Sequence, residues 1–228
     1  MTTTQNIATH KGPPLPAVAG VFTLLFLLGI ILSRILTHGA PLPMPYGDPW
    51  HSQQYYLSFA STVRLSGFLQ LGSAIALGIY TASVTSRLRF LGVTASGPQI
   101  ALFGGIASSI FLASSGMMTW VLSQPGMANT FDTMRGWQLL GFIAGGVAHT
   151  AALGLLVAGI AVPSLMMGYL PKGWAAAGIV IAAVSEVCTL SMVLPQLSFL
   201  IPVGRFSAML WVIVAGALLP RRQIRQTQ

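Results

Sequence analysis

The sequence predicts an all-α, polytopic transmembrane bundle of about six helices that forms a single domain over residues 1–228. The composition is the first reason: of 228 residues, 54% are apolar and only 6% are charged, whereas an ordinary soluble domain has roughly 25% charged residues. So few charges cannot cover a surface that faces water. The second reason is that the apolar residues gather in six stretches, separated by loops too short for a soluble domain.

Each apolar stretch is long enough for a tilted membrane crossing, which needs about 20 residues. The first stretch resembles a signal-peptide core, but it is too long, ends in Arg34 and lacks a small-x-small cleavage site. We therefore expect an uncleaved anchor there. The approximate limits of the six predicted spans are 17–36, 64–84, 99–122, 138–162, 173–194 and 203–220.

The connections contain turn-forming residues and no further domain. The longest connection, 37–58, carries four prolines that exclude a continuous helix through them. Its interleaved Tyr and Trp residues are typical of an interfacial cap that lies on the bilayer. The loops 123–137 and 163–172 are shorter, and we expect the second to be bounded by Pro163 and Pro171.

The basic residues predict the orientation in the membrane. An even number of spans places both termini on one side, and that side has seven Lys and Arg residues against four on the other. Because basic residues accumulate on the cytoplasmic side, we predict a bacterial inner-membrane protein with both termini in the cytoplasm. The residues on the side of the termini are Lys11, Arg87, Arg89, Lys172, Arg221, Arg222 and Arg225, and the others are Arg34, Arg64, Arg135 and Arg205.

Two polar residues lie deep in predicted spans: His149 in the fourth and Glu186 in the fifth. Both are 14 positions from the nearest end of the loop 163–172, so they should lie at nearly the same depth, roughly 20 Å from the inner end. A carboxylate at the bilayer centre must be protonated, paired or close to water. We therefore expect a His149–Glu186 pair that serves either as a proton relay or cation site, or as an interhelical clamp.

A second set of charged residues is expected at the outer ends of the spans. These residues could form an external ion cluster or bind an anionic headgroup or solute, but snorkelling of the arginines to lipid phosphates is the account we favour. The set consists of Arg64, Asp48, Asp132, Arg135 and Arg205.

Small and hydroxylated residues in the spans predict close helix packing. Gly141 and Gly145, and likewise Ala101, Gly105 and Ser109, have the four-residue spacing that lets helix backbones approach each other. We expect these contacts to lie within the chain, with a homodimer face as the less favoured alternative. We expect the span hydroxyls to bond back to carbonyl groups of their own helix; they belong to Ser108, Ser109, Ser114 and Ser115.

The sequence shows no motif of a soluble-type active site. A phosphate-cradling loop, a nucleophile elbow and a span with two acids are all absent from it. His149 is the only histidine in a span, so one chain cannot offer two such ligands to a haem, and no ligand spacing indicates a metal site. Cys188 is expected to be a small buried side chain. We therefore expect no catalytic residue, no metal, no cofactor and no nucleic-acid partner.

Several segments of the chain carry a family resemblance. They are Gly168–Trp174, Leu200–Phe206 and Trp211–Arg222, together with Arg64-Leu65-Ser66-Gly67 and the histidine of the fourth span. In these segments the chain resembles a bacterial six-pass integral membrane protein family that is catalogued as a domain of unknown function. The resemblance covers most of the chain after residue 17. It implies an inner-membrane helical bundle and supplies no catalytic residues, while the loop 37–58 looks individual to this protein.

Three functions are compatible with these features. The leading hypothesis is a non-enzymatic accessory or interaction component, whose partners are the lipid bilayer and either a second copy of the chain or another membrane protein. The first alternative is a small proton-coupled transporter that uses His149 and Glu186. The second is a membrane enzyme that acts on a lipid or a quinone, which requires an open groove lined by His149.

Overall fold

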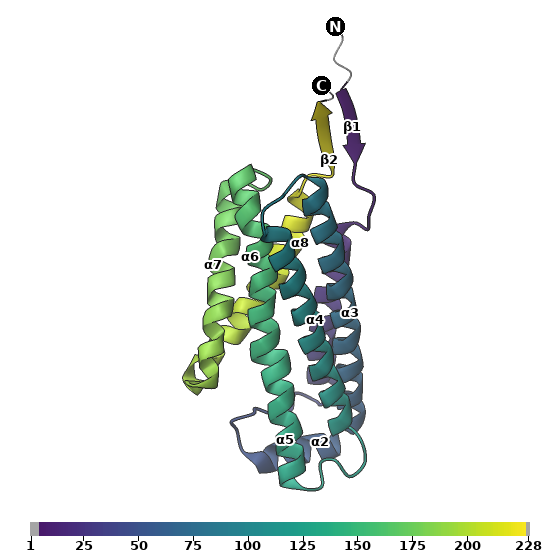
Figure 1. Cartoon of the computed structure of the whole chain (residues 1–228). Helices are drawn as coiled ribbons and strands as arrows, with labels where there is room; N and C mark the ends of the chain where they lie inside the picture. Colours follow the sequence, from purple (N-terminus) through teal and green to yellow (C-terminus); the bar gives the residue numbers. More distant parts are fainter. Residues whose placement is uncertain (1–4, 227–228) are drawn as a thin grey trace.

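The computed structural model describes residues 5–226, with side chains for residues 9–222. Within this part of the chain, six helices are long and apolar enough to cross a membrane, which confirms the predicted all-α transmembrane bundle (Figure 1). These helices are Leu15–Leu36, Ala60–Phe90, Gly97–Leu122, Phe131–Met167, Lys172–Met192 and Pro195–Leu218.

Several of these spans are divided by changes of helix type, and shorter elements join them. The elements in chain order are β1 (Gln5–Thr9), α1 (Leu15–Leu36), α2 (Pro49–Ser58), α3 (Ala60–Phe90), α4 (Gly97–Leu122), α5 (Phe131–Phe142), the π-helix η1 (Ile143–Ala148), α6 (His149–Met167), α7 (Lys172–Val187), the 3-10 helices η2 (Cys188–Met192) and η3 (Pro195–Phe199), α8 (Leu200–Leu218) and β2 (Arg222–Gln226).

The long helices form a closed ring. α1 packs against α3, α3 against α4, α4 against α6, α6 against α7, α7 against α8, and α8 returns to α1. α6 also contacts α8 across the ring. Both termini lie at one end of the bundle, where β1 and β2 form an antiparallel two-stranded ribbon that the sequence did not predict (Figure 1).

The centre of the bundle is filled by large side chains that also carry polar ends. The rings of Tyr80 and Trp211 are buried, at 0% and 1% exposed. The Tyr80 hydroxyl donates to the Val212 carbonyl at 3.1 Å, and the Trp211 indole nitrogen donates to the Trp174 carbonyl at 2.9 Å. Burying an aromatic ring while its polar atom finds a partner is the arrangement that a membrane interior requires.

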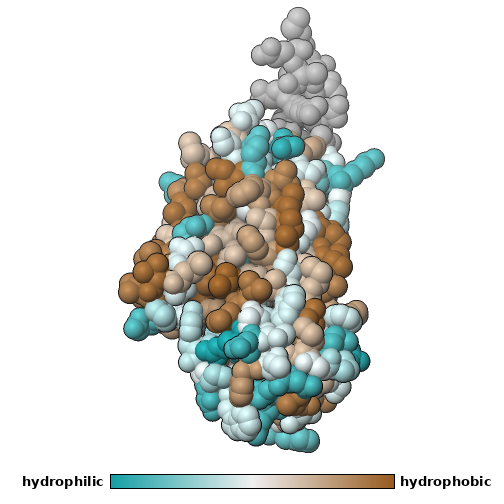
Figure 2. Space-filling view, turned by 60° about the horizontal axis from the view of Figure 1, so that its bottom comes forward, coloured by the Kyte–Doolittle hydropathy of each residue, from teal (hydrophilic) through white to brown (hydrophobic). Residues whose placement is uncertain are grey.

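The opposite end of the bundle is covered by α2 and the first part of α5 (Figure 1). The predicted proline-rich loop 37–58 therefore contains a helix that begins at its last proline. Pro49 occupies the first helical turn, where a missing N–H costs nothing, and the Asp48 side chain accepts a hydrogen bond from the Trp50 amide at 3.0 Å. Figure 2 shows hydrophilic residues at this end and a hydrophobic surface around the middle of the molecule.

The fourth span is longer than predicted, and the prediction that Pro163 bounds the next loop is wrong. Pro163 lies inside α6, which ends at Met167 and is capped by Gly168 in the left-handed region, with φ +70°. α4 begins against the turn that Pro163 disturbs, since a Cβ on Gly97 would lie 2.9 Å from the Gly159 carbonyl oxygen. Proline is tolerated in a membrane helix where neighbouring helices pack against the altered turn.

Glycines set how closely the helices approach. A Cβ on Gly104 of α4 would lie 2.6 Å from the Leu156 amide nitrogen and 2.7 Å from the Ala152 carbonyl oxygen, both in α6. These are backbone atoms, so a side chain could be accommodated only if α4 and α6 moved apart. Gly105 and Gly145 lie against the side chains of Thr81 and Ser115 of other helices, so the predicted small-residue spacings pack within the chain.

The Gly104 contact generates a test of bundle packing. We expect Gly104→Ala to destabilise the protein by about 1–3 kcal/mol, because overpacking forces two backbones apart. The measurement is the thermal unfolding midpoint of the purified protein in a mild detergent. Gly20→Ala is the matched control, since nothing lies within 4 Å of the added Cβ. Equal midpoints for the two variants would contradict the close crossing.

Candidate functional site

The most unusual backbone in the membrane part of the protein is the π-helix η1, Ile143–Ala148, which joins α5 to α6. Its sequence contains the pair Gly145-Gly146, which has no side chains to resist a widened turn. π-helical turns are rare and occur often at functional sites, because they disturb the regular ladder of backbone hydrogen bonds. The widened turn makes carbonyl oxygens available to donors from outside the helix.

Arg205 of α8 supplies those donors. Its Nη2 atom, which carries two hydrogens, donates to the Gly145 carbonyl and has the Gly146 carbonyl at 3.3 Å and the Thr150 hydroxyl at 3.5 Å as further acceptors. The Arg205 Cζ atom also lies 5.1 Å from the centre of the Phe26 ring. A guanidinium has five N–H donors in a fixed plane, so it can bond several carbonyl oxygens while its face rests on an aromatic ring.

Arg205 was predicted to belong to a cluster at the outer ends of the spans, and this placement is wrong. Its side chain reaches into the bundle instead, because the carbonyl oxygens of η1 lie within its length. No carboxylate oxygen lies within 4.0 Å of it in the part of the chain whose side chains are described. The positive charge is therefore stabilised by backbone dipoles and one aromatic ring. We call this arrangement of Arg205, Gly145 and Gly146 the arginine latch.

His149 begins α6 directly after η1 and is completely buried, at 0% exposed. Its Nδ1 atom lies 2.8 Å from the Ser108 hydroxyl and 3.0 Å from the Ser108 carbonyl oxygen. Because a carbonyl oxygen can only accept, this geometry places a hydrogen on Nδ1. The Ser108 hydroxyl in turn donates to the His149 carbonyl at 3.0 Å. The two residues thus connect α4 to α6 through a reciprocal set of hydrogen bonds.

The Nε2 atom of His149 is buried and has no hydrogen-bond partner among the described residues. The rings of His149 and Phe22 of α1 meet in an edge-to-face arrangement, with 6.5 Å between the ring centres. His149 lines neither the groove between α3 and α4 nor the pocket beside Trp50 that are described below. His149 is therefore enclosed by side chains from α1 and α4.

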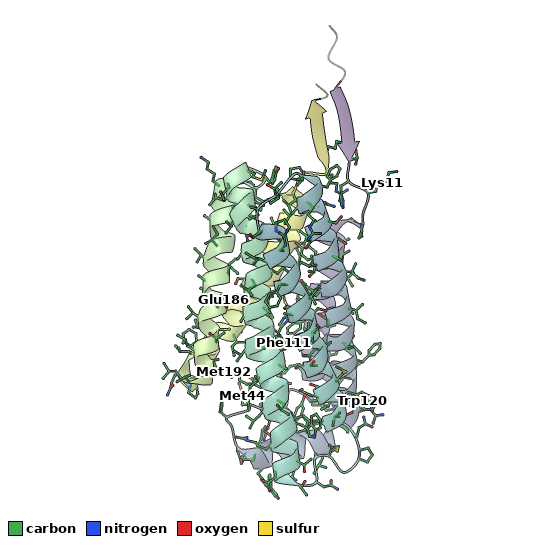
Figure 3. The ribbon with its side chains drawn as sticks, viewed as in Figure 1. Lys11, Met44, Phe111, Trp120, Glu186 and Met192 are labelled. Atoms are coloured by element: carbon green, nitrogen blue, oxygen red, sulfur yellow. The ribbon has the colours of Figure 1, made fainter. Side chains whose placement is uncertain are left out.

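The structure does not bring His149 and Glu186 together. Glu186 lies on the exposed surface of α7 (Figure 3), and its carboxylate accepts no hydrogen bond from a described residue. The two depths differ because α6 continues past Pro163. At about 1.5 Å per residue, His149 lies about 27 Å from Met167, whereas Glu186 lies about 21 Å from Lys172. The residue opposite Glu186 is Gly154, where an added Cβ would lie 3.5 Å from the carboxylate.

The remaining residues of the predicted outer set are divided between two surfaces. Asp48, Asp132 and Arg135 line one small pocket of about 300 Å³ beside Trp50. Arg64 lines a separate groove between α3 and α4. No arginine nitrogen lies within 4.0 Å of a carboxylate oxygen among the described side chains, so the five residues do not form one ion-paired cluster.

Three of the four span serines differ from the prediction that they bond to their own helix. Ser108 bonds His149 of α6, the Ser109 hydroxyl donates to the Ala74 carbonyl of α3 at 2.7 Å, and the Ser115 hydroxyl donates to the Gly141 carbonyl of α5 at 2.9 Å. These hydroxyls face neighbouring helices that contain small residues at the contact, so a second helix comes within hydrogen-bond distance.

The arginine latch is the feature that sequence reasoning missed. Its signals were present in the chain: a pair of glycines within an apolar span, and an arginine near the start of another span. Neither signal by itself indicates a π-helix. No known protein family, no curated protein and no solved structure matches the chain. The fold and the site thus define a six-span helical membrane protein whose function must be argued from its own residues.

The latch generates a prediction about stability. Arg205→Leu leaves the Gly145 and Gly146 carbonyl groups without their donors, and we expect a loss of about 2 kcal/mol in the free energy of unfolding. Amide hydrogen exchange should rise at the start of α6. The thermal midpoint in detergent and exchange mass spectrometry measure the two effects. Arg89→Leu, at an exposed position of α3, is the control that should change neither; an Arg205→Leu protein as stable as the wild type would show that the latch contributes nothing.

Proposed function

We propose that this protein is a non-enzymatic interaction component of a bacterial inner membrane, with both termini in the cytoplasm. In this proposal, a helix of another membrane protein binds the α6–α7 face. We define this face as the exposed surface of α7 around Glu186, where Gly154 of α6 lies opposite the carboxyl group. The observation that carries the proposal is the exposed carboxyl group of Glu186 within a membrane span, in the last turn of α7. The resemblance to a bacterial six-pass family of unknown function is compatible with this role.

An ionisable group on a lipid-facing surface needs a partner. A carboxylate in hydrocarbon is costly, and such residues normally pair with another protein group or line a wet cavity. Asp48 and Asp132 lie at the end of the bundle near α2, so Glu186 is the one acid of this sequence that is deep in a span. Within the described chain its carboxylate has no such partner, which supports a partner from outside.

The surface beside Glu186 suits close contact with a helix. Ala176, Val180, Ala183 and Val187 are exposed on α7 and recur at the three- and four-residue spacing of one helical face. The small side chains of Ala176 and Ala183 on this face let another backbone approach, so that a polar group of the second helix can reach Glu186. The face therefore offers a small-residue contact with one polar attachment point.

The charges favour a different protein over a second copy of this chain. A partner for Glu186 should carry a basic or amide side chain at the same depth. The exposed basic residues of this chain, such as Arg64, Arg89 and Lys172, lie near helix ends. Arg205 lies within a membrane span, but its side chain is directed into its own bundle. A second copy would thus bring a carboxyl group to the face without a cation to pair it.

The two alternative functions have less geometric support. A transporter that relays protons between His149 and Glu186 needs them in contact, whereas His149 bonds Ser108 and Glu186 lies on the outer surface. An enzyme that acts on a lipid or quinone needs an open groove at His149, which is 0% exposed. The interaction role requires only the exposed face that the structure presents.

A photoreactive residue in place of Ala183 tests the proposal in native membranes. We expect illumination to form a discrete adduct with one membrane protein. Its yield should fall about fivefold or more with Glu186→Leu and with Glu186→Lys, because an interhelical polar contact in a membrane contributes about 1–2 kcal/mol. Glu186→Asp keeps the carboxyl group and should retain most of the adduct. The yield is measured on immunoblots.

The same photoreactive residue in place of Ile106 is the positional control, because Ile106 is 45% exposed on α4, away from α7. This position should form lipid adducts only. An adduct whose yield is unchanged in Glu186→Leu would overturn the role of the carboxyl group. An adduct between two copies of this chain would overturn the choice of a different protein as the partner.

A further inference from the structure

A groove of about 720 Å³ runs between α3 and α4 at the end of the bundle near α2. Apolar side chains line most of it: Leu65, Phe68 and Leu71 from α3, and Met117 and Trp120 from α4. Phe68 is 67% exposed, Met117 53% and Trp120 48%, so the walls of the groove are open to the bilayer rather than to the bundle interior.

The floor of the groove is made by two glycines. A Cβ on Gly67 would lie 2.7 Å from the Gly116 carbonyl oxygen, and a Cβ on Gly116 would lie 2.9 Å from the Gly67 carbonyl oxygen. The backbones of α3 and α4 therefore touch at this point, and neither helix has a side chain to fill the space above the contact. The hollow is thus a fixed consequence of how the two helices cross.

The groove extends from headgroup depth into the hydrocarbon. At about 1.5 Å per residue, Arg64 lies about 37 Å along α3 from Arg89 at the other end. The hydrocarbon core of a bilayer is about 30 Å thick, and about 40–45 Å with the headgroups. Arg64 and Arg89 thus reach the two headgroup layers, while Leu71, about 27 Å from Arg89, lies at acyl-chain depth.

We propose that this groove binds one anionic phospholipid, with an acyl chain along the apolar walls and the phosphate and headgroup at Arg64. The Arg64 side chain is exposed at the mouth of the groove, and none of the described residues that line the groove is acidic. The Ser61 hydroxyl at the same mouth supplies a neutral hydrogen-bonding group. An arginine binds a phosphate group with two parallel hydrogen bonds. Trp120 also suits this depth, because tryptophan is enriched at the interface between the hydrocarbon and the headgroups.

This site is more specific than general attraction of a basic residue to the membrane surface. Arg89 has the same charge at the opposite headgroup layer, but it does not line the groove. If the hollow selects the lipid, only the arginine at its mouth should affect retention. The proposal involves α3 and α4 and is independent of the partner proposed for the α6–α7 face.

Native mass spectrometry of the full-length protein in a mild detergent tests the proposal. The probe is an equal mixture of dioleoylphosphatidylglycerol and dioleoylphosphatidylcholine. We expect the wild type to retain one phosphatidylglycerol in preference to phosphatidylcholine. Arg64→Gln should lower that preference about fivefold, since a basic residue near an anionic headgroup contributes about this factor. Arg89→Gln is the matched control and should keep the wild-type preference.

A second variant tests the apolar part of the groove. Met117→Trp places a larger side chain in the hollow from an exposed position, so it should reduce retention of both lipids without unfolding the bundle. Equal retention of the two lipids by the wild type would overturn the proposal. It would also be overturned if Arg89→Gln lowered the preference as much as Arg64→Gln, or if Met117→Trp retained as much lipid as the wild type.

Discussion

The absence of water from the hydrocarbon is the constraint on which this structure depends, because every polar group in the bilayer must find its partner within a protein. For several polar groups the bundle meets this requirement with contacts between helices, although His149 Nε2 and Arg205 Nε are buried without a partner among the described residues. Ser108 and His149 satisfy each other between α4 and α6, and the guanidinium of Arg205 satisfies the carbonyl oxygens of η1. Glycines make these contacts possible, since hydrogen bonds of about 3 Å between helices require backbones that almost touch.

Glu186 differs from these residues because it faces outward from the bundle, and the proposed function follows from this difference. Two other polar residues in the spans, His149 and Arg205, are directed into the bundle and hold helices together. The Glu186 carboxyl group lies over Gly154 on the outer surface of the α6–α7 pair. The same physical requirement that explains the inner pairs is the basis of our proposal that Glu186 pairs with another molecule.

The six spans were predictable from the sequence because the thickness of the hydrocarbon core requires a long apolar run for each crossing. The ends of the helices were less predictable. The end of the fourth span changed the depth expected for His149. Reading Pro163 as the end of the fourth span placed His149 at the depth of Glu186, whereas the helix continues to Met167 and shifts it by about one turn. The arginine latch was not predictable, because neither a glycine pair in an apolar span nor an arginine near the start of another span indicates a π-helix.

The most direct test of this account is the environment of position 186 in liposomes that contain only this purified protein. A spin label is attached to Glu186→Cys after the buried native Cys188 is replaced by alanine, and its accessibility to oxygen is compared with labels at Val180 and Ala182. The account predicts the high accessibility of a lipid-facing position, as at the exposed Val180. Accessibility as low as at the buried Ala182 would contradict it, because Glu186 would then have its partner inside the bundle.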